Sequence, residues 1–178
     1  DAAAKILTIG GTYYAIPNMS PSGREDSANV SYGLMYRADV LEQLGIDKPA
    51  TTEEFADMLR EFKKEDPFKA GSEIAPMTTY SAMLDNLRTC GLGGAFGIAY
   101  EWIDQDGTLV PYQMTDGFAD YLNYLHGLYQ EGLLDVEMPT NTSSTMTSKF
   151  TSGKSAAAMF AYWSVPGLMK TFAETDPN

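Results

Sequence analysis

Residues 32–46, YGLMYRADVLEQLGI, join two structural patterns without a break. Val30 to Tyr36 is a run of apolar and aromatic residues of the kind found in β-strands. Arg37 to Leu44 then predicts a two-turn helix, which Gly45 ends from the C′ position. Strand and helix patterns alternate along the rest of the chain as well, so the sequence predicts an α/β fold.

The chain before this stretch predicts short strands and a loop. Residues 5–9 and 12–16 are apolar segments on either side of a Gly10-Gly11 turn. Residues 18–29 combine Ser, Gly, Pro and charged residues, and they form the most loop-like segment of the chain.

A second helix is expected to begin after the quoted stretch, at a capping box. In this motif the side chains of Thr51 and Glu54 each bind the backbone N–H of the other residue. The helix is expected to end near Asp66. Four apolar residues recur at helical spacing and predict its buried stripe: Phe55, Met58, Leu59 and Phe62.

The same two periodicities predict the remaining elements. They are a strand over 74–78, a helix over 80–87, a β-hairpin of 101–104 and 108–112 around Asp106-Gly107, helices over 116–130 and 146–150, a strand over 156–161 and a helix over 165–173.

The helix over 116–130 is the longest one expected, with Thr115 as its cap and Gly132 as its stop. Its apolar face is predicted to consist of Phe118, Leu122, Leu125 and Tyr129. Three tyrosines are expected to fill the core beneath it: Tyr121, Tyr124 and Tyr129.

Composition and charge narrow the class of protein. Of 178 residues, 44% are apolar and 20% are charged, as in an ordinary soluble globular protein. A chain of this size buries about 70% of its unfolded surface, which allows one core and little room for a second domain. Twelve Lys and Arg against 24 Asp and Glu give a net charge of −12. Such a chain repels nucleic acid and anionic lipid, so neither is an expected partner.

The single cysteine and the single histidine exclude several kinds of site. Cys90 cannot form an internal disulfide or a Cys-rich zinc site, and it is expected to be a small buried thiol. His126 cannot form an HExxH zinc centre, and it is expected at the surface of a helix or half-buried. No apolar run approaches the ~20 residues of a membrane span. The chain opens at Asp1 and reads as beginning within a domain.

Motifs of catalysis are missing from the sequence. It contains no GxSxG elbow, no P-loop and no GxGxxG fingerprint. Paired carboxylates could serve a glycosidase, and five acidic residues are available for that role: Asp104, Asp106, Glu131, Asp135 and Glu137. Asp104 and Asp106 fall on the expected hairpin turn, where acidic residues are common. A binding protein is therefore favoured, and a glycoside hydrolase domain is the alternative from another class.

Aromatic residues are the most informative side chains. They make up 12% of the chain and include 11 Tyr. A tyrosine combines a flat apolar face with a polar tip, which suits the C–H faces and hydroxyls of a sugar. Four aromatic residues fall near strand ends or helix starts, where an open α/β sheet forms its ligand crevice: Tyr32, Tyr80, Tyr162 and Trp163.

Five segments in order resemble one protein family. They are residues 11–17 (GTYYAIP), 32–46, 49–55 (PATTEEF), 128–135 (LYQEGLLD) and 150–159 (FTSGKSAAAM). Together they are similar to family 1 extracellular solute-binding proteins of ABC importers, the group that includes maltose-binding protein. The resemblance is greatest to the lipoprotein branch from Gram-positive bacteria that binds oligosaccharides.

The resemblance implies a periplasmic-binding-protein type II fold, with a small central sheet flanked by helices. Residues 1–178 would form a single lobe, the second of a two-lobed protein, entered after the first hinge crossing. The parent protein would be extracellular and lipid-anchored at the cell surface. It would close on its ligand like a hinge and deliver it to a membrane permease without reacting with it.

The resemblance also points to individual binding residues. Tyr80 matches an aromatic residue at a helix start that stacks on a sugar ring in the family. Trp163 falls near a cleft aromatic that follows a small-residue strand, with Tyr162 beside it. Tyr32 and Asn29 lie near the cleft loop. A peptide or another polar solute remains the alternative ligand, because these motifs specify the fold more firmly than the ligand.

One segment departs from the family. Many relatives carry an oxygen-rich loop, built like a calcium site, where this chain has residues 66–73, DPFKAGSE. Phe68 and Ala70 replace two expected oxygen donors, and calcium requires six or more oxygens. We therefore predict no metal at this loop and no cofactor.

Overall fold

The computed structural model describes residues 8–13 and 32–175. Strands β1 (Thr8–Ile9) and β2 (Thr12–Tyr13) pair antiparallel around the predicted Gly10-Gly11 turn. The predicted loop over 18–29, including Asn29, lies outside the described residues.

The core of the fold is a three-stranded sheet whose central strand is β7 (Ala157–Ala161). β3 (Tyr32–Tyr36) pairs with it antiparallel, with Tyr32 opposite Ala161, and β4 (Met77–Thr78) pairs with it in parallel. Side chains alternate between the two faces of a strand, so β7 sends Met159 to one face and Phe160 to the other.

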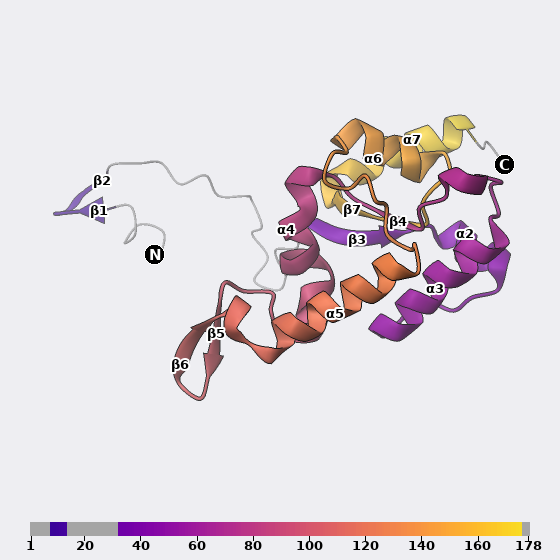
Figure 1. Ribbon diagram of the computed structural model, residues 1–178. Helices are drawn as coiled ribbons and strands as arrows, with labels where there is room; N and C mark the ends of the chain where they lie inside the picture. Colours follow the sequence, from indigo (N-terminus) through magenta and orange to yellow (C-terminus); the bar gives the residue numbers. More distant parts are fainter. Residues whose placement is uncertain (1–7, 14–31, 176–178) are drawn as a thin grey trace.

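Helices cover both faces of this sheet (Figure 1). α3 (Thr52–Glu65) and α5 (Asp116–Gln130) pack on the face that carries Met159. α6 (Ser143–Thr151) and α7 (Val165–Thr175) pack on the face that carries Phe160. The predicted α/β fold, a small sheet flanked by helices, is confirmed.

The local predictions around residues 37–66 are confirmed. α2 (Ala38–Leu44) ends at Gly45, which adopts a left-handed conformation with φ of 67°. At the start of α3, the Glu54 N–H donates to Thr51 Oγ1 at 3.1 Å, and the Thr51 N–H donates to Glu54 Oε2 at 3.1 Å. The predicted stripe of α3 is fully buried, and the helix ends before Asp66.

The predicted hairpin is formed by β5 (Trp102–Gln105) and β6 (Thr108–Pro111). Both turn residues, Asp106 and Gly107, have positive φ, as the tight turn of a two-residue hairpin requires. β4 is shorter than the predicted 74–78, and α6 begins three residues before the predicted 146, where Thr142 accepts the Thr145 N–H at 3.1 Å.

The predicted apolar face of α5 is wrong for two of its four residues. Leu122 is 47% exposed and Tyr129 is 54% exposed, so neither fills the core. The buried residues are instead Tyr121 and Leu128, one position earlier in each case. Compared with the prediction, α5 is rotated about its axis so that Tyr121 faces the core. There the Tyr121 ring packs against the Phe96 ring at a centroid distance of 5.7 Å. The hydroxyl of Thr115 donates to the carbonyl of Tyr112 and does not cap the helix.

Residues 81–96 form a chain of short helical turns where one helix over 80–87 was predicted. These are η2 (Ser81–Met83), α4 (Leu84–Asn86), the π-helical η3 (Leu87–Gly91) and η4 (Leu92–Phe96). Gly93 permits this path, because a Cβ there would lie 2.3 Å from the carbonyl oxygen of Arg88.

The predicted burial of Cys90 is also wrong. η3 turns Leu87 and Arg88 inward, and the thiol of Cys90 is exposed. His126 is exposed on α5 as predicted, with its Nε2 3.1 Å from the Gln130 amide nitrogen. Within the described residues, no helix combines the length and apolar character needed to cross a bilayer.

Candidate functional site

A small cavity of about 150 Å³ lies where β4 and β7 end and β3 begins. The carboxyl ends of parallel strands are the usual place for a ligand crevice in an open α/β sheet. The residues that line the cavity are Tyr32, Tyr80, Met83, Ser143, Met146, Met159, Phe160, Ala161, Trp163 and Ser164.

Each aromatic residue of the cavity is placed by a strand end. Tyr32 is the first residue of β3, and Tyr80 follows β4 by two positions, immediately before η2. Trp163 lies in η6 (Tyr162–Ser164), the single turn that joins β7 to α7. Sheet pairing therefore brings together three side chains that are far apart in the sequence.

Trp163 is the most exposed large side chain among the lining residues. Its ring makes edge-to-face contacts with Tyr32 and with Tyr162, each at a centroid distance of 5.2 Å. It nevertheless remains 55% exposed. A large aromatic ring held on two sides and open to solvent provides a fixed apolar surface for a ligand.

Three of the five binding residues predicted from the sequence line this cavity: Tyr32, Tyr80 and Trp163. Tyr162 packs beside Trp163 but is not a lining residue. Asn29 lies outside the described residues. The sequence interpretation missed the lining serines, of which Ser143 could have been found from the Thr142 cap that precedes it.

A buried polar network lies close behind the cavity. Both Thr78 Oγ1 and Asn141 Nδ2 donate to Asp135 Oδ2, at 2.6 and 2.7 Å. Lys149 Nζ, on α6, donates to the same oxygen at 2.7 Å. The Ser81 N–H donates to the carbonyl of Asn141 at 3.4 Å. The network therefore connects β4, the turn after Tyr80 and α6, three elements that carry or adjoin lining residues.

The charges of this network stabilise each other. Burial by itself would raise the pKa of Asp135, but the hydrogen bonds that it accepts, above all from Lys149, hold the pKa below its ordinary value. Burial would lower the pKa of Lys149, but its bonds to Asp135 and Glu137 raise the pKa above its ordinary value. Both groups are therefore ionised at neutral pH.

Four of the five carboxylates that could have served a glycosidase have other partners, and Asp106 lies in the hairpin turn. Asp104 Oδ1 accepts the Gly107 N–H within the hairpin turn, and Glu131 binds Arg60. Asp135 and Glu137 both bind Lys149. Among the residues that the structure describes, no acidic side chain lines the cavity.

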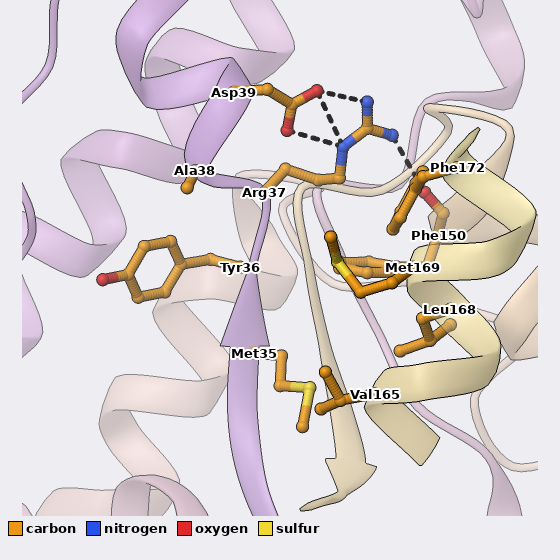
Figure 2. A pocket seen from close by; sticks show the side chains of 10 residues that line it. All are labelled: Met35, Tyr36, Arg37, Ala38, Asp39, Phe150, Val165, Leu168, Met169 and Phe172. Carbon is orange, nitrogen blue, oxygen red and sulfur yellow. Dashed lines mark hydrogen bonds and ion pairs between the residues drawn. The ribbon is translucent and has the colours of Figure 1, made fainter. Parts of the chain in front are cut away.

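A larger cavity of about 440 Å³ lies at the opposite end of β3. Figure 2 shows it between β3 and α7, with the side chains of Met35, Val165, Leu168 and Met169 around it. Its charged pair, Arg37 and Asp39, is already joined by hydrogen bonds. A polar solute would leave its own hydroxyls unpaired there, so the smaller cavity is the better candidate despite its size.

The loop over residues 66–73 contains two acidic residues, and both already have partners. Glu73 pairs with Lys154. The two carboxylate oxygens of Asp66 accept the N–H groups of Ala70 and Gly71, each at 2.7 Å. Across residues 8–13 and 32–175, no three His, Cys, Asp or Glu side chains gather as a metal-binding group.

We expect calcium and EDTA, each at about 1 mM, to leave the melting temperature unchanged, because a ligand stabilises a protein only by binding its folded state. The measurement is differential scanning fluorimetry, with magnesium as the control ion. A melting temperature that rises by several degrees with calcium but not with magnesium would contradict the prediction. It would show that other oxygen ligands complete a calcium site.

The fold and the cavity define a class of protein: an α/β fold that offers an aromatic, uncharged cavity at the ends of its strands. The family model described as bacterial extracellular solute-binding protein matches residues 11–178. The chain belongs to this family, whose members are solute-binding proteins of ABC transporters.

Two curated relatives come from Bacillus subtilis (strain 168). The polygalacturonan/rhamnogalacturonan-binding protein YtcQ is 26% identical over 154 residues, which are 84% of this chain and 29% of that protein. The lipoprotein LipO is 26% identical over 128 residues, which are 68% of this chain and 25% of that protein. The chain thus spans less than a third of the length of these relatives.

Among solved structures, the alginate-binding protein AlgQ2 superposes with a TM-score of 0.65 at 21% identity. The match covers 82% of this chain and 30% of AlgQ2. The predicted periplasmic-binding-protein type II fold is confirmed by this likeness.

Proposed function

We propose that this chain is one lobe of a two-lobed extracellular solute-binding protein and that its ligand is a carbohydrate. The observation that carries the proposal is Trp163, held between Tyr32 and Tyr162 yet more than half exposed at the strand ends. Because the two neighbouring tyrosines already fix the ring at the cavity, a ligand can cover its apolar face without first ordering it.

The chemistry of the cavity fits a sugar. The ring faces of Trp163 and Tyr80 can stack on the C–H patches of a pyranose or furanose. The hydroxyls of Ser143 and Ser164 stand at the same cavity and can exchange hydrogen bonds with sugar hydroxyls. YtcQ and AlgQ2, which are similar to this chain, are named as binding proteins for polysaccharides.

The size of the cavity supports the proposal of a half-site. Ligand pockets usually enclose about 300–1,000 Å³, whereas this one has about 150 Å³. The chain also spans only 30% of AlgQ2. A second lobe would supply the opposite wall and close over the ligand by a hinge motion.

The proposed protein delivers its ligand without transforming it. None of the residues that line the cavity is acidic, so the described part of the chain places no general acid against a bound sugar. Its partner would be the membrane permease of an ABC importer. Its anchor would be a lipid, as the likeness to the lipoprotein LipO suggests.

Replacing Trp163 with alanine in the complete protein is expected to weaken oligosaccharide binding about 30-fold, equivalent to about 2 kcal/mol for a central aromatic contact. Isothermal titration calorimetry with a panel of oligosaccharides and peptides measures the effect. Trp102 is the matched control, since it is 59% exposed on β5 and does not line the cavity. An equal loss in Trp102→Ala and Trp163→Ala, or binding of peptides alone, would contradict the carbohydrate site.

A further inference from the structure

The lining of the cavity carries no formal charge. Its ten residues are four aromatic residues, three methionines, two serines and one alanine. We propose, on the basis of the proposed function, that the ligand is a neutral oligosaccharide and not a uronate polymer. YtcQ and AlgQ2 are named for polygalacturonan and alginate, whose sugars carry carboxylates, so the proposal separates this chain's ligand from theirs.

The basic residues of the described part of the chain lie outside the cavity lining. Of the 12 Lys and Arg, Lys5 and Arg24 lie outside the described residues, which leaves 12 − 2 = 10. None of those ten lines the cavity. Three of them are largely buried and could act at low dielectric: Arg37, Arg88 and Lys149.

Arg37 is held at the far end of β3. Its guanidinium lies 4.6 Å from the ring centroids of both Phe68 and Phe172. It also pairs with Asp39, as Figure 2 shows. These contacts fix the cation at the end of the strand opposite Tyr32.

Arg88 is held behind the turns that follow Tyr80. It binds the carboxylates of Asp85 and Glu101 and the carbonyl of Ile98, and its guanidinium lies 3.9 Å from the Tyr112 ring centroid. Two carboxylates and a buried carbonyl leave this cation no free donor directed at the cavity.

Lys149 is the cation closest in sequence to a lining residue, three positions after Met146 on α6. Its ammonium binds Asp135 at 2.7 Å and Glu137 at 2.6 Å. Two carboxylates already outweigh its single charge, so Lys149 cannot neutralise a third one on a ligand.

A uronate would therefore meet an unfavourable environment here. Carboxylate recognition normally uses Arg or Lys, which repay the loss of water around the anion. The chain also has a net charge of −12, whose field repels a polyanion before contact. A neutral sugar carries no charge that must be dehydrated on binding. The rings and hydroxyls of the cavity match its surface.

The test compares neutral trisaccharides with their uronate forms, which differ only at C6. The complete protein is titrated at low and moderate salt with α-1,4-linked galactotriose and trigalacturonate, and then with the neutral and uronate forms of other trisaccharides. We expect the tightest ligand to be neutral and to bind at least about tenfold more tightly than its uronate form. A uronate that binds more tightly than every neutral sugar would overturn this inference and leave the carbohydrate function intact. Binding of peptides or other solutes in place of all sugars would instead overturn the proposed function.

A gain-of-charge variant tests the physical cause. Ser143→Lys adds a cation at the cavity and is expected to raise the affinity for trigalacturonate about tenfold at low salt. Ser144→Lys is the matched control, because it adds the same charge one residue away on an exposed position outside the lining. If both variants bind trigalacturonate no better than the unmodified protein, lack of a cation is not what excludes uronates, and the inference fails.

Discussion

Replacing Asp135 with alanine is expected to lower the free energy of unfolding by about 3–5 kcal/mol. The change leaves the largely buried ammonium of Lys149 without its buried counter-ion, with only the exposed Glu137 to balance it. Thr78 and Asn141 lose the carboxylate that accepts their hydrogen bonds. Urea unfolding followed by circular dichroism measures the loss. Asp104→Ala is the control, because that carboxylate is exposed and serves only the hairpin turn. A loss below about 1 kcal/mol in Asp135→Ala would mean that the ion pair contributes no more than a surface pair.

The same pair makes stability depend on pH. The folded-state pKa of Asp135 lies below its ordinary value, so its carboxylate stabilises the fold at pH values above about 4. That stabilisation is lost as the pH falls through the folded-state pKa. The difference in unfolding free energy between the unmodified chain and Asp135→Asn should therefore be constant near neutral pH and shrink below about pH 4. A difference that grows as the pH falls would contradict the lowered pKa.

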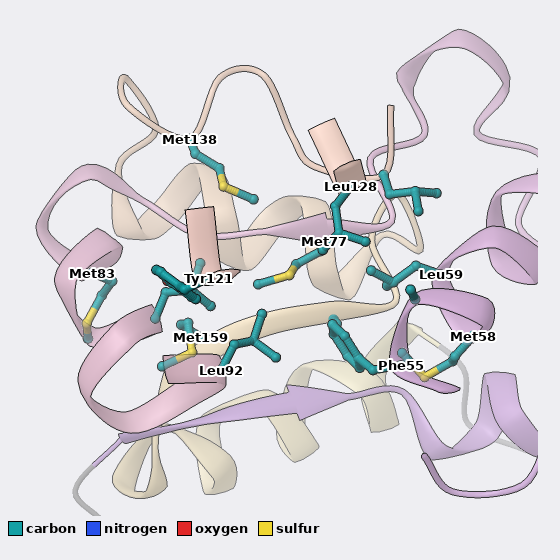
Figure 3. Packing of buried hydrophobic residues seen from close by; sticks show 14 of the residues in the cluster. Phe55, Met58, Leu59, Met77, Met83, Leu92, Tyr121, Leu128, Met138 and Met159 are labelled. Carbon is teal, nitrogen blue, oxygen red and sulfur yellow. The ribbon is translucent and has the colours of Figure 1, made fainter. Parts of the chain in front are cut away.

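Replacing Leu59 with alanine is expected to cost about 2–5 kcal/mol of unfolding free energy. Leu59 is completely buried in the cluster that joins α3 to the sheet, and Figure 3 shows it near Phe55 and Met58. The truncated side chain would leave a cavity that surrounding residues can fill only in part.

Leu122→Ala is the matched control for Leu59→Ala. Leu122 lies on α5 and is 47% exposed, so the same chemical change there is expected to cost less than about 0.5 kcal/mol. Equal losses in the two variants, measured by urea unfolding, would show that the rotation of α5 differs from the one described.

Local patterns predicted much of the fold because their causes are local. The capping box at Thr51 and the left-handed end of α2 at Gly45 depend on residues within a few positions of each other. The Asp106-Gly107 hairpin depends on two backbone angles. The tertiary structure cannot easily overrule such signals, and in this protein it does not.

The rotation of α5 and the exposure of Cys90 had no local signal. The residues of α5 are apolar or aromatic on more than one side, so helical spacing allows two faces. The partner of the helix, Phe96, selected the face of Tyr121. Cys90 is exposed because the irregular turns of residues 81–96, which Gly93 permits, rotate Arg88 inward.

For the candidate site too, some features could be predicted from local sequence and others depend on tertiary structure. That Tyr32, Tyr80 and Trp163 lie at strand ends could be predicted from the sequence, since a strand pattern and its end are visible in a few residues. That Trp163 lies against Tyr32 follows only from the antiparallel pairing of β3 with β7. The network of Asp135 joins Thr78 to a residue 57 positions away, and the lack of charge in the cavity depends on where Lys149 directs its ammonium. Composition and periodicity report what each segment prefers, but the charge of a site is a property of side chains that only folding brings together.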